Sequence, residues 1–126
     1  MEKIKVGEFV RTTDGYIGKC QKIDVYYGDV FIRTELKRII YDFEVVKHNF
    51  DIKKLIEKGD FVNGYEVDEY DGYDEKGNYF ENDLGIPIYD DANMDCIVEY
   101  RPIRLMEVKS IVTREMFQKV EYRMEE

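Results

Sequence analysis

The chain has 126 residues, 44% of them hydrophobic and 37% charged, which suits one globular domain with a well-solvated surface. Its net charge of −9 argues against binding nucleic acid through phosphates and against binding anionic membranes, and it favours a basic partner. No apolar run approaches the roughly 20 residues of a membrane helix, and residues 1–6 lack the apolar core of a signal peptide. We therefore expect a cytoplasmic protein in which Cys20 and Cys96 are reduced, buried thiols.

The first half of the chain reads as short strands separated by turns. Strands are expected over 8–11, 16–23, 30–33 and 44–47, with glycine-containing turns at 12–15 and 27–29. Residues 34–41 fit either a helix or a strand, because Leu36, Ile39 and Ile40 share a helical face and 39–41 would also suit a strand. Residues 51–57 favour a short helix capped by Asp51 and ended by Gly59.

The second half is also rich in expected strands. We expect a long strand over 61–70 broken at Asn63-Gly64, a polar loop over 71–78, and at best an edge strand over 86–89, since Pro87 has no N–H to donate. Strands over 97–100 and 104–108, a helical turn over 113–118 and a tail strand over 120–124 complete the pattern. The pattern predicts a mostly β fold with one or two short helices and SH3-like small-barrel elements. Residues 1–126 form a single domain on this interpretation, with sub-units 1–47 and 48–126 as the alternative.

A short motif occurs twice. Val6-Gly7-Glu8-Phe9-Val10-Arg11 is echoed by Lys58-Gly59-Asp60-Phe61-Val62-Asn63, and Gly-Tyr follows each copy within a few residues. A glycine, an acid and two apolar residues commonly open the first strand of a small SH3-like barrel. The motif thus indicates either two related β units or a frequent strand start that occurs twice by coincidence.

These motifs also carry a resemblance. Residues 6–12, 14–19, 46–48, 55–65 and 108–117, less than half of the chain, resemble a family of small proteins from phages and prophages of low-GC Gram-positive bacteria. The resemblance implies a phage-derived gene acting in a bacterial cytoplasm, and it brings no activity and no site residues. Phage genomes carry many small acidic proteins that block host defence or nucleic-acid enzymes, which is an argument by association. The acidic stretch after Tyr65 lies outside the resemblance.

No motif indicates catalysis or a cofactor. The chain has one serine, Ser110, and one histidine, His48, without a nucleophile elbow, and its nine glycines form no phosphate-binding loop. The two cysteines and His48 have no zinc-type spacing, and the acidic residues around 68–78 do not fit the EF-hand pattern. Paired carboxylates carry no specific signal among 28 acids. We therefore predict a non-enzymatic protein with no cofactor, and a structural or surface role for His48.

Residues 60–100 are the unusual segment. They contain thirteen acids against one lysine, interleaved with eight aromatic residues, six of them tyrosine. Tyrosine offers large contact area at low entropic cost, and acids spaced among tyrosines can imitate the charges and flat rings of nucleic acid. The alternative interpretation is a solvated surface whose tyrosines are half buried against the core.

The segment leads to a functional prediction. We predict a binding protein whose acidic, tyrosine-rich face engages a basic surface of a bacterial host protein, as a nucleic-acid-mimicking inhibitor of a host defence or nucleic-acid enzyme. The predicted partner-binding residues are Asp68, Glu69, Tyr70, Asp71, Tyr73, Asp74, Glu75, Tyr79, Glu81, Asp83, Asp90 and Asp91. The alternative is a structural or assembly module that forms homo-oligomers through strand edges.

Overall fold

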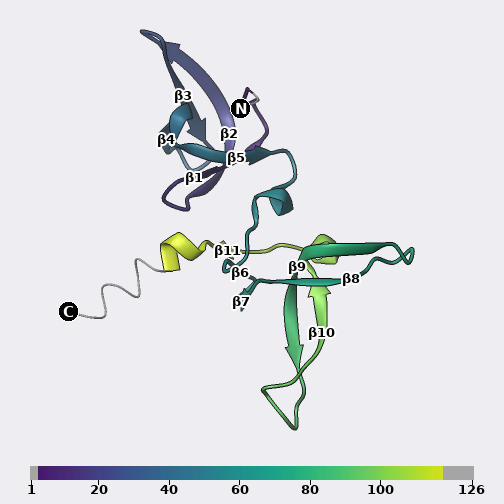
Figure 1. Ribbon diagram of the computed structural model, residues 1–126. Helices are drawn as coiled ribbons and strands as arrows, with labels where there is room; N and C mark the ends of the chain where they lie inside the picture. The colour runs from purple at the N-terminus through teal and green to yellow at the C-terminus, as the bar shows by residue number, and fades with distance from the viewer. Residues whose placement is uncertain (1–2, 118–126) are drawn as a thin grey trace, which may run out of the picture. The chain divides into compact units, whose positions relative to one another are not determined.

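A computed structural model describes residues 3–117, which are mostly β and fall into two compact units (Figure 1). Unit 1 comprises residues 1–55 and 115–126, and unit 2 comprises residues 56–114. The sequence favoured one domain, with a division after residue 47 as the alternative. The contacts group the described residues on either side of Leu55, with residues 115–117 on the side of unit 1.

Unit 1 is built on one five-stranded antiparallel sheet with the order β4-β3-β2-β1-β5. Its elements are β1 (Phe9–Thr12), β2 (Ile17–Tyr26), β3 (Asp29–Thr34), β4 (Ile39–Tyr41), the 3₁₀ helix η1 (Asp42–Glu44), β5 (Val45–Asn49) and the 3₁₀ helix η2 (Ile52–Leu55). Alternate side chains point inward, so that one face of the sheet supplies Val10, Cys20, Ile32, Ile40 and Val45 to the core, which Ile4 from the preceding segment completes.

The ambiguous segment 34–41 forms a tight turn and a strand. The Thr34 N–H donates to the Arg38 carbonyl at 2.9 Å, and Lys37 adopts a positive φ of 63° in the turn. The expected helix over 51–57 is a single 3₁₀ turn, in which the Asp51 carboxylate accepts the Lys53 N–H at 3.0 Å. The turn ends at Leu55 because the next side chain, Ile56, packs into the core of unit 2.

Unit 2 contains two three-stranded antiparallel sheets. The larger has the order β10-β9-β8 and the smaller the order β11-β6-β7. Their strands are β6 (Phe61–Val62), β7 (Tyr65–Glu66), β8 (Asp68–Tyr73), β9 (Tyr79–Tyr89), β10 (Ile97–Pro102) and β11 (Ile111–Val112), with the 3₁₀ helix η3 (Ile103–Leu105) after β10. The core consists of Ile56, Val62, Val67, Ile86 and Ile103.

The expected strand over 61–70 is in fact three strands. Asn63 at φ 53° and Gly64 at φ 89° form a hairpin turn with positive φ at both positions, which turns β6 back into β7. The next strand, β8, then runs through Tyr73, so the loop expected over 71–78 is confined to 74–78.

Residues 86–89 were expected to form at best an edge strand, but they belong to a central strand. These residues end the eleven-residue strand β9, which is the central strand of its sheet. Strand β9 pairs with β8 only as far as Gly85, and beyond that point β10 is its sole neighbour. Pro87 therefore lies where β9 is locally an edge, and a residue without an N–H fits there.

The strand expected over 104–108 is wrong. Residues 103–105 form η3, and the backbone that follows bonds to one side chain instead of to a neighbouring strand. The Asn63 amide accepts the N–H groups of Lys109 at 2.7 Å and Ser110 at 3.1 Å, and it donates to the Glu107 carbonyl at 2.9 Å. Residues 114–117 are helical within the turn expected over 113–118, and the tail strand expected over 120–124 lies outside the described residues.

The repeated motif builds a defined turn in unit 1. Gly7 has φ 95°, a conformation that glycine adopts readily, and its N–H donates to the Cys20 carbonyl at 2.8 Å. The Glu8 N–H donates to the Lys5 carbonyl at 3.1 Å, and the Glu8 carbonyl accepts the Cys20 N–H at 2.8 Å. The Glu8 side chain is buried; it accepts the Lys5 N–H at 3.4 Å and pairs with Nδ1 of His48.

The same set of backbone hydrogen bonds recurs in the turn of unit 2. Gly59 has φ 92° and donates to the Val67 carbonyl at 2.9 Å, while the Asp60 N–H donates to the Glu57 carbonyl at 3.1 Å and the Asp60 carbonyl accepts the Val67 N–H at 2.8 Å. The buried Asp60 carboxylate accepts the N–H groups of Glu57 at 2.8 Å and Arg114 at 3.0 Å. The two copies of the motif thus share one local structure, and the second partner of the acid differs between them.

Candidate protein-binding site

The strand register distributes the predicted binding residues over both faces of the β8–β9 hairpin. Directly opposed residues of an antiparallel pair share a face, so Tyr70 lies with its partner Asp83, and Tyr73 lies with its partner Tyr79 on the other face. Alternation along each strand then adds three exposed carboxylates to the second face. We call this second group the acidic hairpin face: Glu69, Asp71, Tyr73, Tyr79 and Glu81.

Tyr70 lies on the first face, where its ring is packed. The ring stacks on Tyr100 with centroids 4.6 Å apart and an interplanar angle of 2°, and it meets Phe80 edge-on at 5.8 Å. Gly85 makes room for it, because a Cβ at that position would lie 2.6 Å from a Tyr70 ring carbon. Burial raises the pKa of the Tyr70 hydroxyl, which donates to Asp83 at 3.4 Å. Tyr70 is thus a structural residue of the sheet.

Arg104, which lies outside the acidic segment 60–100, neutralises part of the same face. Arg104 of η3 forms ion pairs with Asp83 and, at 3.4 Å, with Glu75, and its guanidinium lies 4.7 Å from the centre of the Phe80 ring. Within residues 60–100 the only basic residue is Lys76, so the sequence count left Arg104 out. Two of the predicted carboxylates are therefore paired within the protein.

Three further predicted aspartates stabilise turns or strand ends. Asp74 accepts the N–H groups of Lys76 at 2.9 Å and Asn78 at 2.8 Å, and the hydrogen bond from Asn78 lowers the pKa of its carboxyl. Asp90 accepts the Ala92 N–H at 2.7 Å, and Asp68 accepts the Glu69 N–H at 2.8 Å. These bonds are the usual ones by which aspartate supports a turn.

The acidic hairpin face remains open. Tyr73 is 71% and Tyr79 57% exposed, and their rings touch edge-to-face with centroids 5.4 Å apart. Glu69 and Glu81 are exposed and make no ion pair within residues 3–117. Asp71 is exposed as well, and its carboxylate accepts the Asn82 N–H at 3.0 Å where the β8–β9 register shifts.

The last two predicted residues, Asp90 and Asp91, belong to a different hairpin. The loop over 74–78 precedes β9 and the loop over 90–96 follows it, so the two loops lie at opposite ends of this strand (Figure 1). The second loop also contains Cys96, which is exposed and not buried as expected, whereas Cys20 is buried in unit 1. Both cysteines are free thiols. The twelve predicted residues thus do not form one continuous surface.

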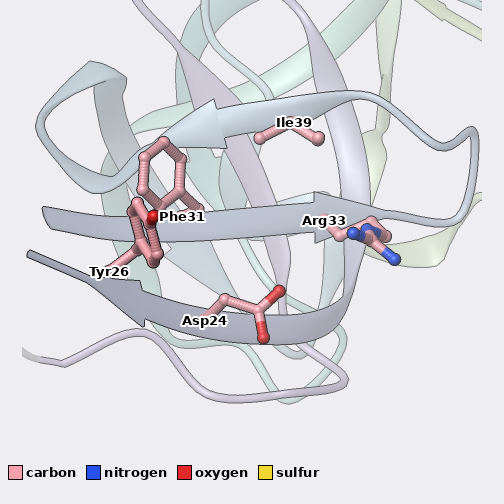
Figure 2. Close-up of a pocket in the computed structure, with 5 residues that line it drawn as sticks. All are labelled: Asp24, Tyr26, Phe31, Arg33 and Ile39. Carbon is pink, nitrogen blue, oxygen red and sulfur yellow. The ribbon is translucent and has the colours of Figure 1, made fainter.

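Unit 1 carries an exposed apolar surface that the sequence prediction missed. On the outer face of β2, β3 and β4, Phe31 packs on Tyr41 with ring centroids 4.7 Å apart, and Tyr41 stacks on Phe43 at 5.0 Å. A hollow of about 260 Å³ lies on the same face (Figure 2). Its lining residues are Asp24, Tyr26, Phe31, Arg33 and Ile39. The alternation of β2 and β3 is the signal that could have placed these residues together.

The chain gives no match to a protein-family model, to a curated protein or to a solved structure. Within residues 3–117, none of the helices is long and apolar enough to cross a membrane. The same residues contain no group of three or more His, Cys, Asp or Glu side chains that could hold a metal ion. A functional proposal therefore depends on the surfaces themselves.

Proposed function

We propose that the chain is a non-enzymatic binding protein whose acidic hairpin face engages a basic surface of another protein. The observation that carries the proposal is the separation of charge between the units. The residues of unit 2 include fifteen acids and six bases, whereas those of unit 1 include thirteen of each. The whole net charge of −9 is therefore carried by the unit that holds the acidic hairpin face.

The acidic hairpin face presents two kinds of side chain, carboxylates and tyrosine rings, to which we assign different roles. Glu69 and Glu81 are exposed and unpaired within residues 3–117, so they can attract a basic surface and accelerate encounter. Tyr73 and Tyr79 form a contiguous pair of exposed rings that a partner can cover, as tyrosine does at many binding hot spots. Arg101 lies on the same face of the sheet, opposite Ile86, so the run of acidic side chains on this face stops before that position.

The partner we propose is a nucleic-acid-binding protein of a bacterial host. A groove that holds phosphates and bases presents cations and flat apolar surfaces, and spaced carboxylates beside exposed rings complement both. The resemblance to phage proteins supports a bacterial host and a cytoplasmic location. On this proposal the protein blocks the groove by occupying it and catalyses no reaction.

The test compares two matched charge reversals. The immobilised full chain is exposed to bacterial lysate, and the retained proteins are identified by mass. Glu69→Lys combined with Glu81→Lys should release a basic protein that the unmodified chain retains, with an affinity loss of about tenfold or more, since each removed charge contact contributes on the order of 1 kcal/mol.

The control has the same total charge. Asp91→Lys combined with Asp95→Lys changes two exposed acids in the loop over 90–96 and should leave the retained protein in place. Equal loss with both double variants would mean that net charge alone holds the partner, and the acidic hairpin face would then be rejected as the site.

A further inference from the structure

Strand β4 is an edge of the unit 1 sheet. It lies at one end of the strand order and pairs with β3 alone. Ile39 is 58% and Tyr41 38% exposed, whereas Ile40 between them is fully buried. Edge strands usually carry a lysine, a proline or a bulge that prevents pairing with another chain. Among the described residues, β4 has neither a lysine nor a proline; its protection is its length of three residues and the Glu44 carboxylate, which accepts the Tyr41 N–H at 3.3 Å.

The hydrogen bonds show which backbone groups of β4 face the open edge. In an antiparallel pair, residues bonded to the neighbouring strand alternate with residues whose N–H and C=O point away. Thr34 bonds to Arg38 at 2.9 Å, so Ile40 is the next residue directed toward β3, and Ile39 and Tyr41 are directed outward. The Tyr41 N–H agrees with this, because it donates to the Glu44 carboxylate at 3.3 Å and not to β3.

We propose that β4 pairs with β4 of a second copy of this chain, antiparallel, about a two-fold axis at Ile40. In this register Ile39 lies opposite the partner's Tyr41. The Ile39 N–H donates to the partner's Tyr41 carbonyl, and the partner's Tyr41 N–H exchanges its bond to the exposed Glu44 carboxylate for the Ile39 carbonyl. The two-fold axis repeats the pairing on its other side, as an isologous interface requires. The two exposed side chains also meet as an aromatic–aliphatic cross-strand pair, which is a favourable combination.

Charge complementarity selects this occupant. The residues that flank β4 are Arg38 and Asp42, one of each sign. Antiparallel pairing about Ile40 places Arg38 opposite the partner's Asp42 at both ends of the interface, while an in-register parallel pairing would oppose like charges. Arg38 already forms an ion pair with Asp14 at 3.1 Å, and its five N–H donors allow a second carboxylate.

The surrounding surface fits the same partner. Ile39 forms one wall of the hollow on the outer face of β2, β3 and β4 (Figure 2). Pairing at β4 continues this face into the second copy, because strands added at an edge keep the same side of the sheet. The partner's Tyr41 then lies beside Ile39, and the row of rings formed by the half-buried Phe31 and the exposed Tyr41 and Phe43 continues from one copy into the next.

The test measures self-association of the full chain by sedimentation over a wide concentration range. The unmodified chain should be a dimer at the upper concentrations, and Ile39→Lys should raise the dimer dissociation constant at least tenfold. The matched control is Val98→Lys, which adds the same charge at an exposed residue on the edge strand β10 of unit 2 and should change nothing. Equal melting temperatures of both variants and the unmodified chain show that the fold is intact.

A second variant tests the charge pairing separately. Asp42→Arg opposes two arginines at both ends of the interface and should raise the dissociation constant about tenfold, since each opposed pair changes by on the order of 0.5–1 kcal/mol. Asp29→Arg makes the same charge change at the exposed first residue of β3 and should have no effect. A chain that is monomeric at every concentration overturns the proposal, and so does a dimer that Val98→Lys weakens as much as Ile39→Lys does.

Discussion

The two units begin alike and present opposite surfaces. Each opens with a glycine at φ near 90° and a buried acid whose backbone makes the same hydrogen bonds. Unit 1 as a whole has no net charge, and the outer face of its sheet carries aromatic side chains. Unit 2 carries the whole net charge of the chain. The comparison teaches that the shared motif determines how each unit starts. The residues that follow it determine what the unit can bind.

The buried acids offer the strongest test of this likeness. Asp60→Ala should lower the free energy of unfolding by about 3 kcal/mol, because the N–H groups of Glu57 and Arg114 lose a buried, charged acceptor. Glu8→Ala should destabilise by a smaller amount, about 2 kcal/mol, since it removes one long bond from a backbone N–H and one side-chain contact with His48.

Urea unfolding measures both changes. Glu69→Ala, at an exposed residue of unit 2, is the control and should alter stability by less than about 0.5 kcal/mol. An Asp60→Ala variant as stable as this control would show that the repeated turn does not depend on its acid.

A second comparison concerns one ion-paired arginine in each unit, Arg11 in unit 1 and Arg104 in unit 2. Arg11 is fully buried; it donates to the Leu55 carbonyl at 3.0 Å and forms an ion pair with Glu115 at 2.8 Å. The Arg104 side chain is 34% exposed in its pairs with Asp83 and Glu75. Arg11→Met should therefore destabilise by about 2–3 kcal/mol, because Glu115 and the Leu55 carbonyl lose a buried partner.

Arg104→Met should destabilise by about 1 kcal/mol, since solvent screens its ion pairs. Thermal and urea unfolding of the two variants measures the difference. Similar losses would mean that burial does not distinguish the two arginines.

The smallest expected effect is a dependence on pH in unit 1. Asp14 accepts a hydrogen bond from Thr12 and pairs with Arg38, and the hydrogen bond from Thr12 is the main cause that lowers the pKa of its carboxyl from 3.8 to about 2. A depressed pKa in the folded state stabilises the fold above the unfolded-state value of 3.8 and ceases to do so as the pH falls through about 2.

Asp14→Asn should thus destabilise by about 1 kcal/mol at neutral pH, a value reduced for solvent exposure, and by little near pH 2. Unfolding by urea across this range measures the difference from the unmodified chain, with Asp29→Asn at the exposed start of β3 as the control. A destabilisation that stays constant down to the lowest pH would contradict the assignment to the Asp14 carboxylate.

Local sequence determined much of this protein. Alternation of apolar residues and the Asp-Gly and Asn-Gly turns predicted a mostly β chain, and the structure confirms it. The repeat was visible because both copies need a glycine with positive φ and an acid that accepts nearby N–H groups, requirements that lie within a few residues. The count of acids likewise located the charged segment before any fold was known.

Tertiary structure decided the rest, because the deciding partners lie far apart in the chain. Residues 104–108 read as a strand, but the Asn63 side chain takes up the backbone groups that follow η3. Arg104 neutralises Asp83 only because η3 returns to the β8–β9 hairpin. The exposure of Tyr73 and the packing of Tyr70, alike in composition and three residues apart, follow from strand register, which places one ring over Gly85 and the other on the open face.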